Sequence, residues 1–147
     1  MTMRALAALL WMALPVLAAP VPKEVKRPSD AVRIQGLWAY DTYDAGNGAR
    51  GTSGRWYFEK EKMYSGGQNT TDKKGTPYGI VLRIDTTPSQ MDITTDNGPL
   101  ICNGIYKFDG DELHIAYVGT GVERPKDFAS ANGKTIIVFK RVSEDKK

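Results

Sequence analysis

The chain has 147 residues, of which 41% are hydrophobic and 25% are charged, with a formal net charge of +3 and one cysteine. This composition is typical of a single globular domain, and so small a charge gives no indication of a nucleic-acid partner. Because Cys102 is the only cysteine, an internal disulfide is excluded and the hydrophobic core must provide the stability.

The N-terminal residues have the pattern of a secretory signal peptide. A positive charge on Arg4 precedes an apolar run over residues 5–17, and Val16 and Ala18 are the small residues that suit cleavage after Ala18. The apolar run is too short to span a bilayer comfortably. We therefore expect residues 1–18 to be a signal peptide and the protein to be exported, periplasmic or extracellular, with no stable membrane insertion after cleavage.

The remaining residues divide into a linker, one domain and a tail. Residues 19–30 are rich in proline and lysine, which is typical of a linker, and Ser29-Asp30 would cap a single helical turn. Residues 31–143 have the length of one domain, and residues 144–147 form a charged tail. From Ile34 onward the dominant pattern is the alternation of apolar and polar residues, which predicts strands.

Two segments fifty positions apart share one pattern. Residues 54–65 and 104–115 each contain a glycine, two aromatic residues two positions apart, four polar residues and then a large apolar residue. Each segment therefore predicts a strand, a tight turn and a second strand. Period-two geometry places the paired apolar residues on one face of the sheet. The pairs expected in the second hairpin are Phe108 with Leu113, Tyr106 with Ile115, and Gly104 with Tyr117.

A third hairpin and two single strands complete the pattern. The hairpin turns at residues 86–89, and the single strands are expected at Ile34–Tyr43 and Lys134–Val142. Eight strands in chain order, each with one apolar face, predict an all-β, antiparallel, up-and-down barrel, because closure removes the unprotected edges. The apolar face of the third hairpin is expected to carry Ile80, Leu82, Ile84, Met91 and Ile93.

Several pieces of the chain together resemble a known family. They are QGLWAY at residues 35–40, GIYKFDGDELHIAY at 104–117, ERPKDFAS at 123–130 and IIVFKRV at 136–142. Over residues 34–142 the chain resembles a planctomycete-type family of exported, lipocalin-like domains whose function is unassigned. The resemblance implies a lipocalin-like β-barrel.

The resemblance also implies a structural contact at one end of the barrel. In the wider lipocalin superfamily, a Gly-x-Trp in the first strand packs under a basic residue of the last strand. Gly36 and Trp38 match the first part, and Arg141 shares a face of the last strand with Ile137 and Phe139. A guanidinium over an indole gains cation–π attraction and covers the end of the barrel.

The residues needed for catalysis or metal binding do not cluster in the sequence. His114 is the only histidine, and it alternates with Leu113 and Ile115, so we expect it to face solvent. No set of His, Cys, Asp and Glu has the spacing of a metal site, and Cys102 falls on the apolar face as an inert thiol. We therefore expect no enzymatic activity, no cofactor and no metal.

The loop at residues 119–133 has two interpretations. As a lid, it would bring Arg124 to an anionic head group and Phe128 to the entrance of the barrel. As a structural segment, it would plug the barrel mouth with Phe128 while Arg124 ties the loop down, and this arrangement needs no ligand.

The expected interior leaves two functions open. An eight-stranded barrel is just wide enough to be filled by side chains or to hold one small ligand. The protein is therefore expected either to bind a small apolar or aromatic ligand or to be an envelope interaction or structural module with a packed core and no ligand. The aromatic residues expected to point inward are Trp38, Tyr40, Trp56, Phe58, Tyr106, Phe108 and Tyr117. The expected ligand-binding residues are Trp38, Tyr40, Trp56, Tyr106, Tyr117, Arg124 and Phe128.

Overall fold

The computed structural model describes residues 28–66 and 75–143. The expected signal peptide, most of the expected linker and the residues after 143 lie outside these ranges. Within the described ranges, no helix combines the length and the apolar character needed to cross a membrane.

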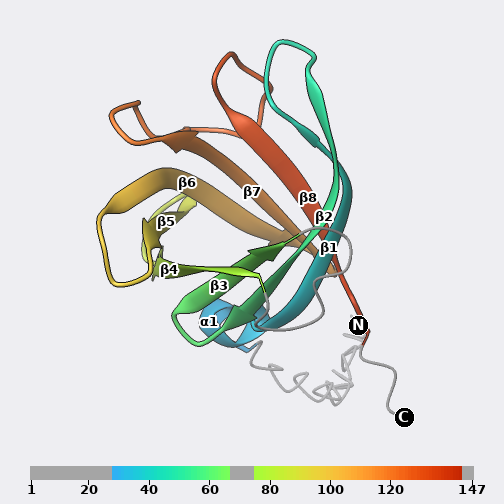
Figure 1. The fold of residues 1–147 in the computed structure, drawn as a ribbon, viewed down its shortest axis with the longest axis vertical. Coiled ribbons are helices and arrows are strands. Elements are labelled where there is room, and N and C mark those ends of the chain that lie inside the picture. Colours follow the sequence, from blue (N-terminus) through green and yellow to red (C-terminus); the bar gives the residue numbers. More distant parts are fainter. Residues whose placement is uncertain (1–27, 67–74, 144–147) are drawn as a thin grey trace, which may run out of the picture.

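The described residues form a closed barrel of eight antiparallel strands in chain order, as the sequence predicts (Figure 1). Each strand pairs with the next, and the last pairs with the first, which closes the ring. A short helix, α1 (Asp30–Arg33), precedes the barrel. The strands are β1 (Gly36–Asp44), β2 (Arg50–Glu59), β3 (Lys62–Gly66), β4 (Thr76–Arg83), β5 (Ser89–Thr95), β6 (Leu100–Asp109), β7 (Glu112–Gly119) and β8 (Thr135–Arg141).

The registers of the hairpins are those expected from the alternation. In the pair of β6 and β7, Gly104 lies opposite Tyr117 and Phe108 opposite Leu113. The prediction for Ile84 is wrong, because β4 ends one residue earlier and the Ile84 side chain is 58% exposed at the start of the turn. Alternation therefore places the apolar faces correctly but does not say at which residue a strand stops.

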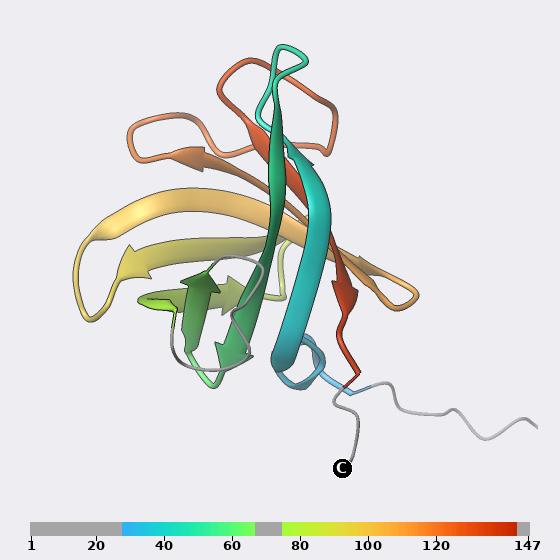
Figure 2. The same cartoon turned by 45° about the vertical axis from the view of Figure 1, so that its right-hand side comes forward.

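Helix α1 closes the end of the barrel at which β1 begins (Figure 2). The expected start of the first strand is wrong by two residues, since Ile34 caps the helix and β1 begins at Gly36. Ile34 is fully buried in the core, and the indole N–H of Trp38 donates a hydrogen bond of 2.7 Å to its carbonyl oxygen. Gly36 has a φ of 101°, a left-handed conformation that favours glycine and lets the chain turn from helix into strand.

The expected contact between Arg141 and Trp38 is confirmed. The guanidinium carbon of Arg141 lies 4.3 Å from the centre of the Trp38 ring. The same guanidinium donates hydrogen bonds to the carbonyl oxygens of Gln35, at 2.7 Å, and of Arg33. Arg33 in turn lies 3.9 Å over the ring of Phe108. Two cation–π contacts and two hydrogen bonds thus fasten the segment around α1 to β8 and β6.

The aromatic residues expected inside the barrel all belong to its core or pack against it. Trp38 and Tyr106 are each 1% exposed. Phe139 of β8 lies between Tyr40 and Trp56, with ring centres 5.2 and 4.9 Å away. Full burial of side chains of this size contributes about 1.5–3 kcal/mol each. The half of the barrel nearer α1 is therefore filled by the protein's own side chains.

Candidate functional site

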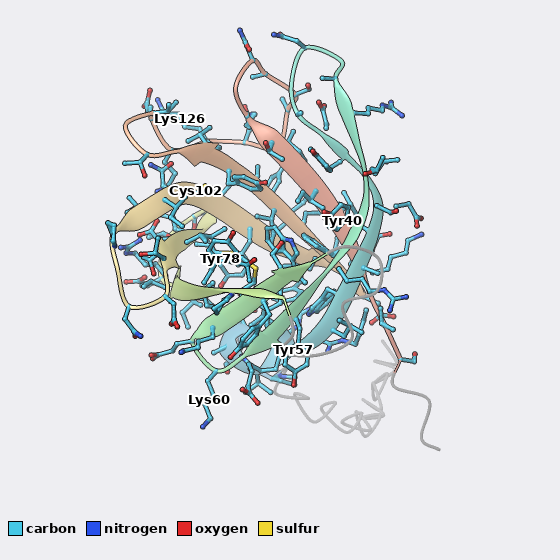
Figure 3. All side chains as sticks on the ribbon, in the orientation of Figure 1. Tyr40, Tyr57, Lys60, Tyr78, Cys102 and Lys126 are labelled. Atoms are coloured by element: carbon cyan, nitrogen blue, oxygen red, sulfur yellow. The ribbon has the colours of Figure 1, made fainter. Side chains whose placement is uncertain are left out.

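A cavity of 170 Å³ lies inside the barrel towards the end opposite α1, and we call it the mouth cavity. Side chains from β2 through β7 form its lining. Figure 3 shows Tyr78 and Cys102 within the ring of strands, whereas Lys60 points away from it. The lining residues are Trp56, Met63, Ser65, Tyr78, Ile93, Ile101, Cys102 and Tyr117.

Aromatic rings make up a large part of the cavity wall. The rings of Trp56 and Tyr117 have their centres 6.3 Å apart and are tilted by 39°. Tyr40 reaches this region because its ring lies over Gly54, where an added Cβ would stand 2.4 Å from the tyrosine hydroxyl. A glycine at this position therefore leaves room for the Tyr40 ring on the inner face of the sheet.

The polar groups in the lining are uncharged. They are the hydroxyls of Ser65, Tyr78 and Tyr117, the thiol of Cys102 and the indole N–H of Trp56. Burial raises the pKa of Tyr117 to about 12, although a hydrogen bond with Thr135 acts in the opposite direction. Burial also raises the pKa of Cys102. Tyr117 and Cys102 therefore stay neutral near pH 7, and a thiol with a raised pKa is a poor nucleophile.

The predicted ligand-binding residues do not all meet at the mouth cavity. Trp56 and Tyr117 line it, and Tyr40 lies in the core close by. Trp38 and Tyr106 belong instead to the packed end near α1. The Tyr106 hydroxyl donates a hydrogen bond of 3.1 Å to Asp30, and burial together with the negative charge of Asp30 raises the pKa of Tyr106.

Other lining residues were not among the predicted ligand-binding residues. Tyr78 precedes Ile80 and Leu82 on the same face of β4, so extending the alternation backwards would have found it. Ile101 and Cys102 are consecutive in the chain, and both line the cavity. Strict alternation would place consecutive residues on opposite faces of the sheet. A register shift between β5 and β6 at this point explains why both line the cavity, and alternation alone cannot predict such a shift.

Arg124 lies outside the barrel, where it ties the segment between β7 and β8 to the wall. Its guanidinium donates hydrogen bonds to the carboxylate of Asp92, at 2.5 Å, and to the carbonyl oxygen of Gly104, at 2.6 Å. Arg83 binds the second carboxylate oxygen of Asp92, also at 2.5 Å. This agrees with the structural interpretation of Arg124. The buried Asp92 was not predicted, because it alternates like any outward-facing residue.

Phe128 also lies on the outer wall, and this corrects both interpretations of the loop, which placed Phe128 at the mouth. Its ring is 5.1 Å from the ammonium of Lys107 and 6.4 Å from the ring of His114. His114 points outward as expected, but its side chain is only 18% exposed and lies 3.2 Å from Glu112. The outward-facing Ile105 is only 1% exposed, and it lies beside residues 123–126 of the same segment.

No metal site is visible in residues 28–66 and 75–143, where no group of three or more His, Cys, Asp or Glu side chains could hold an ion. Other hollows are larger than the mouth cavity. One of 350 Å³ lies beside α1, and Tyr106, Phe108 and Phe128 form part of its lining. Two more lie on the outer surface. One of 420 Å³ runs along β1 and β8, and another of 440 Å³ lies under residues 123–126. Neither contains the convergent aromatic lining of the mouth cavity.

Comparisons of the chain with protein-family models, with curated proteins and with solved structures give no match. The barrel and its cavity are therefore the features that indicate a function.

Proposed function

We propose that the protein is an exported, lipocalin-like barrel that binds a small, ring-sized ligand in the mouth cavity and acts by binding, not by catalysis. The observation that carries this proposal is a cavity of 170 Å³ with Trp56 and Tyr117 in its wall, inside a barrel that is otherwise packed. The resemblance of residues 34–142 to exported lipocalin-like domains supports the export and the barrel, while the function of that family is unassigned. Because a fold hosts many functions, the cavity carries more weight than the resemblance.

The volume of the cavity limits the size of the ligand. Pockets for drug-sized ligands usually measure about 300–1,000 Å³. An apolar cavity of about 150 Å³, by contrast, holds one benzene molecule. The mouth cavity, at 170 Å³, therefore suits one ring with a small substituent and is too small to enclose a long acyl chain or a fused polycyclic molecule.

Titration with toluene, read by tryptophan fluorescence, tests the proposal. Trp56 lines the cavity and Trp38 lies in the packed end, so toluene should produce a saturable change that the Trp56→Phe variant loses and the Trp38→Phe variant keeps. Palmitate, whose chain is too long for the cavity, should produce none. A flat titration with toluene, or saturation by palmitate, would contradict the proposal.

A cavity-filling variant provides an independent check. Cys102→Phe adds a ring to the lining and should weaken toluene binding at least about tenfold, at a cost of about 1–3 kcal/mol in stability from overpacking. Val138→Phe is the matched control, since Val138 is 38% exposed on the outer side of β8 and should leave binding unchanged. Thermal melting of both variants shows whether the barrel remains folded.

A packed envelope module without a ligand is the second candidate. Exposed apolar side chains favour it: Val81 is 48% exposed and borders, with Ala31, a surface hollow of 320 Å³. Such a surface suits a protein contact better than a small ligand. A folded protein that gives no saturable response to toluene would favour this candidate.

A further inference from the structure

Among the residues that the structure describes, none gives the mouth cavity a counter-ion for a charged ligand. None of its lining residues carries a charge. On β3, whose inner face forms part of the lining, Lys62 is engaged elsewhere, in an ion pair of 3.0 Å with Asp96. A carboxylate or an ammonium group that entered the cavity would lose its hydration and gain no ion pair. The lining therefore favours uncharged ligands, whether apolar or polar, over anions and cations.

Two hydroxyl groups of the lining are available to a ligand. Tyr78 lies opposite Met63, and Ser65 lies two residues beyond Met63 on the same inner face of β3. None of the hydrogen bonds among the described residues involves either hydroxyl. The third hydroxyl, of Tyr117, is already bonded to Thr135. Both residues are partly exposed, so a polar substituent on the ligand would take the place of solvent as the hydrogen-bond partner of these hydroxyls.

We infer that the mouth cavity selects uncharged, monocyclic aromatic ligands with one hydrogen-bonding substituent, such as phenols, and that the Tyr78 hydroxyl recognises this substituent. The inference rests on the proposed ligand-binding function and names its ligand class. The ring would lie against Trp56 and Tyr117, whose tilted arrangement suits edge-to-face contacts. The substituent would point towards β3 and β4, where Ser65 and Tyr78 lie.

The test compares four probes of similar size on the protein recovered after expression of the full chain. Toluene, phenol, benzoate and benzylammonium are each titrated at pH 7, and binding is followed by the NMR signals of the Ile93 and Ile101 methyl groups, which line the cavity. Toluene and phenol should shift these signals in a saturable way. Benzoate and benzylammonium should bind at least about 100-fold more weakly than toluene, because neither finds a counter-ion.

Substitution of Tyr78 tests its role. Tyr78→Phe keeps the ring and removes the hydroxyl, so phenol affinity should fall about five- to tenfold while toluene affinity stays within about twofold. Ser65→Ala is the companion variant, with a smaller expected loss for phenol. Tyr57→Phe is the matched control, because Tyr57 alternates with the buried Trp56 and pairs with Tyr64 on the outer face, with ring centres 6.2 Å apart.

The outcomes separate this inference from the proposed function. If no probe shifts the methyl signals of the wild type, the proposed function fails and the inference fails with it. If toluene binds but benzoate binds equally well, or if Tyr78→Phe leaves phenol affinity unchanged, the function stands and the inference is overturned. Selective loss of phenol binding in Tyr78→Phe supports both.

Discussion

Asp92 holds a surface segment in place through one carboxylate. It is 7% exposed and accepts hydrogen bonds of 2.5 Å from both Arg83 and Arg124. Burial alone would raise the pKa of Asp92, but the hydrogen bonds and charges of the two arginines hold it below its ordinary value. A pKa that is lower in the folded state means that the carboxylate stabilises the fold above the unfolded-state pKa of about 3.9 and loses this contribution as the pH falls.

The variant Asp92→Asn should therefore destabilise the protein in a pH-dependent way. At pH 7 it removes two charge-assisted hydrogen bonds, at an expected cost of about 2–3 kcal/mol in the free energy of unfolding. Below about pH 4 the unfolded wild-type chain takes up a proton at Asp92 while the folded carboxylate, whose pKa is lowered, stays ionised, so the difference between the two proteins should shrink as the pH falls. Urea denaturation at pH 7 and pH 3 measures this. Asp85→Asn, in the exposed turn after β4, is the control, and a difference that does not change with pH would contradict the explanation.

At the scale of elements, the segment between β7 and β8 acts as an outer cover for the barrel. Arg124 anchors one part of it, and Phe128 packs over Lys107 and His114. Near its end, the ammonium of Lys134 binds the Asp127 carboxylate at 2.9 Å. These contacts hold the segment to the barrel, and none of the residues that make them lines the mouth cavity.

Phe128→Ala should loosen this segment without changing ligand binding. Loss of the partly buried ring removes about 1 kcal/mol of apolar burial, which corresponds to about fivefold more frequent local opening. Tryptic cleavage after the exposed Lys126 should accelerate by a similar factor, while toluene affinity should remain that of the wild type. Val122→Ala, at a position that is 54% exposed, is the control for cleavage. Loss of toluene binding in Phe128→Ala would instead restore the interpretation of the segment as a lid.

At the scale of the whole molecule, the closed ring makes one cooperative unit with two different ends. Helix α1 and the contact of Arg141 with Trp38 close one end, and the mouth cavity with Trp56 lies towards the other. Both tryptophans belong to a single core cluster. A small domain with one continuous core unfolds in an all-or-none transition.

The two tryptophans should therefore report the same unfolding event. In the Trp38→Phe variant of the chain without residues 1–18, which contain Trp11, the remaining Trp56 reports on the mouth, and in the matching Trp56→Phe variant the remaining Trp38 reports on the closed end. Within each variant, the urea midpoint from tryptophan fluorescence should coincide with the midpoint from far-ultraviolet circular dichroism. An earlier fluorescence transition of Trp56 alone would show that the mouth opens separately from the rest of the barrel.

Much of the fold could be predicted from local patterns in the chain. The alternation of apolar residues placed every hairpin, and the facing of Phe108 and Leu113 followed from the period of two residues. The strand ends were predicted less well, because Ile34 and Ile84 fit the alternating pattern. In the structure Ile34 caps α1, and Ile84 is exposed at the start of a turn, so neither belongs to a strand. For the candidate site, Trp56 and Tyr117 could be predicted because the period-two pattern shows which large aromatic residues point into the barrel.

By itself, the sequence determined the barrel, since the inward or outward facing of a strand residue depends only on its position in an alternating run. Tertiary structure decided what the barrel contains. Whether Tyr78 and Cys102 border a space or fill it depends on how side chains from several strands fit together, and no single segment encodes that volume. The position of Phe128 was decided in the same way, because its contacts with Lys107 and His114 join segments that are distant in the chain.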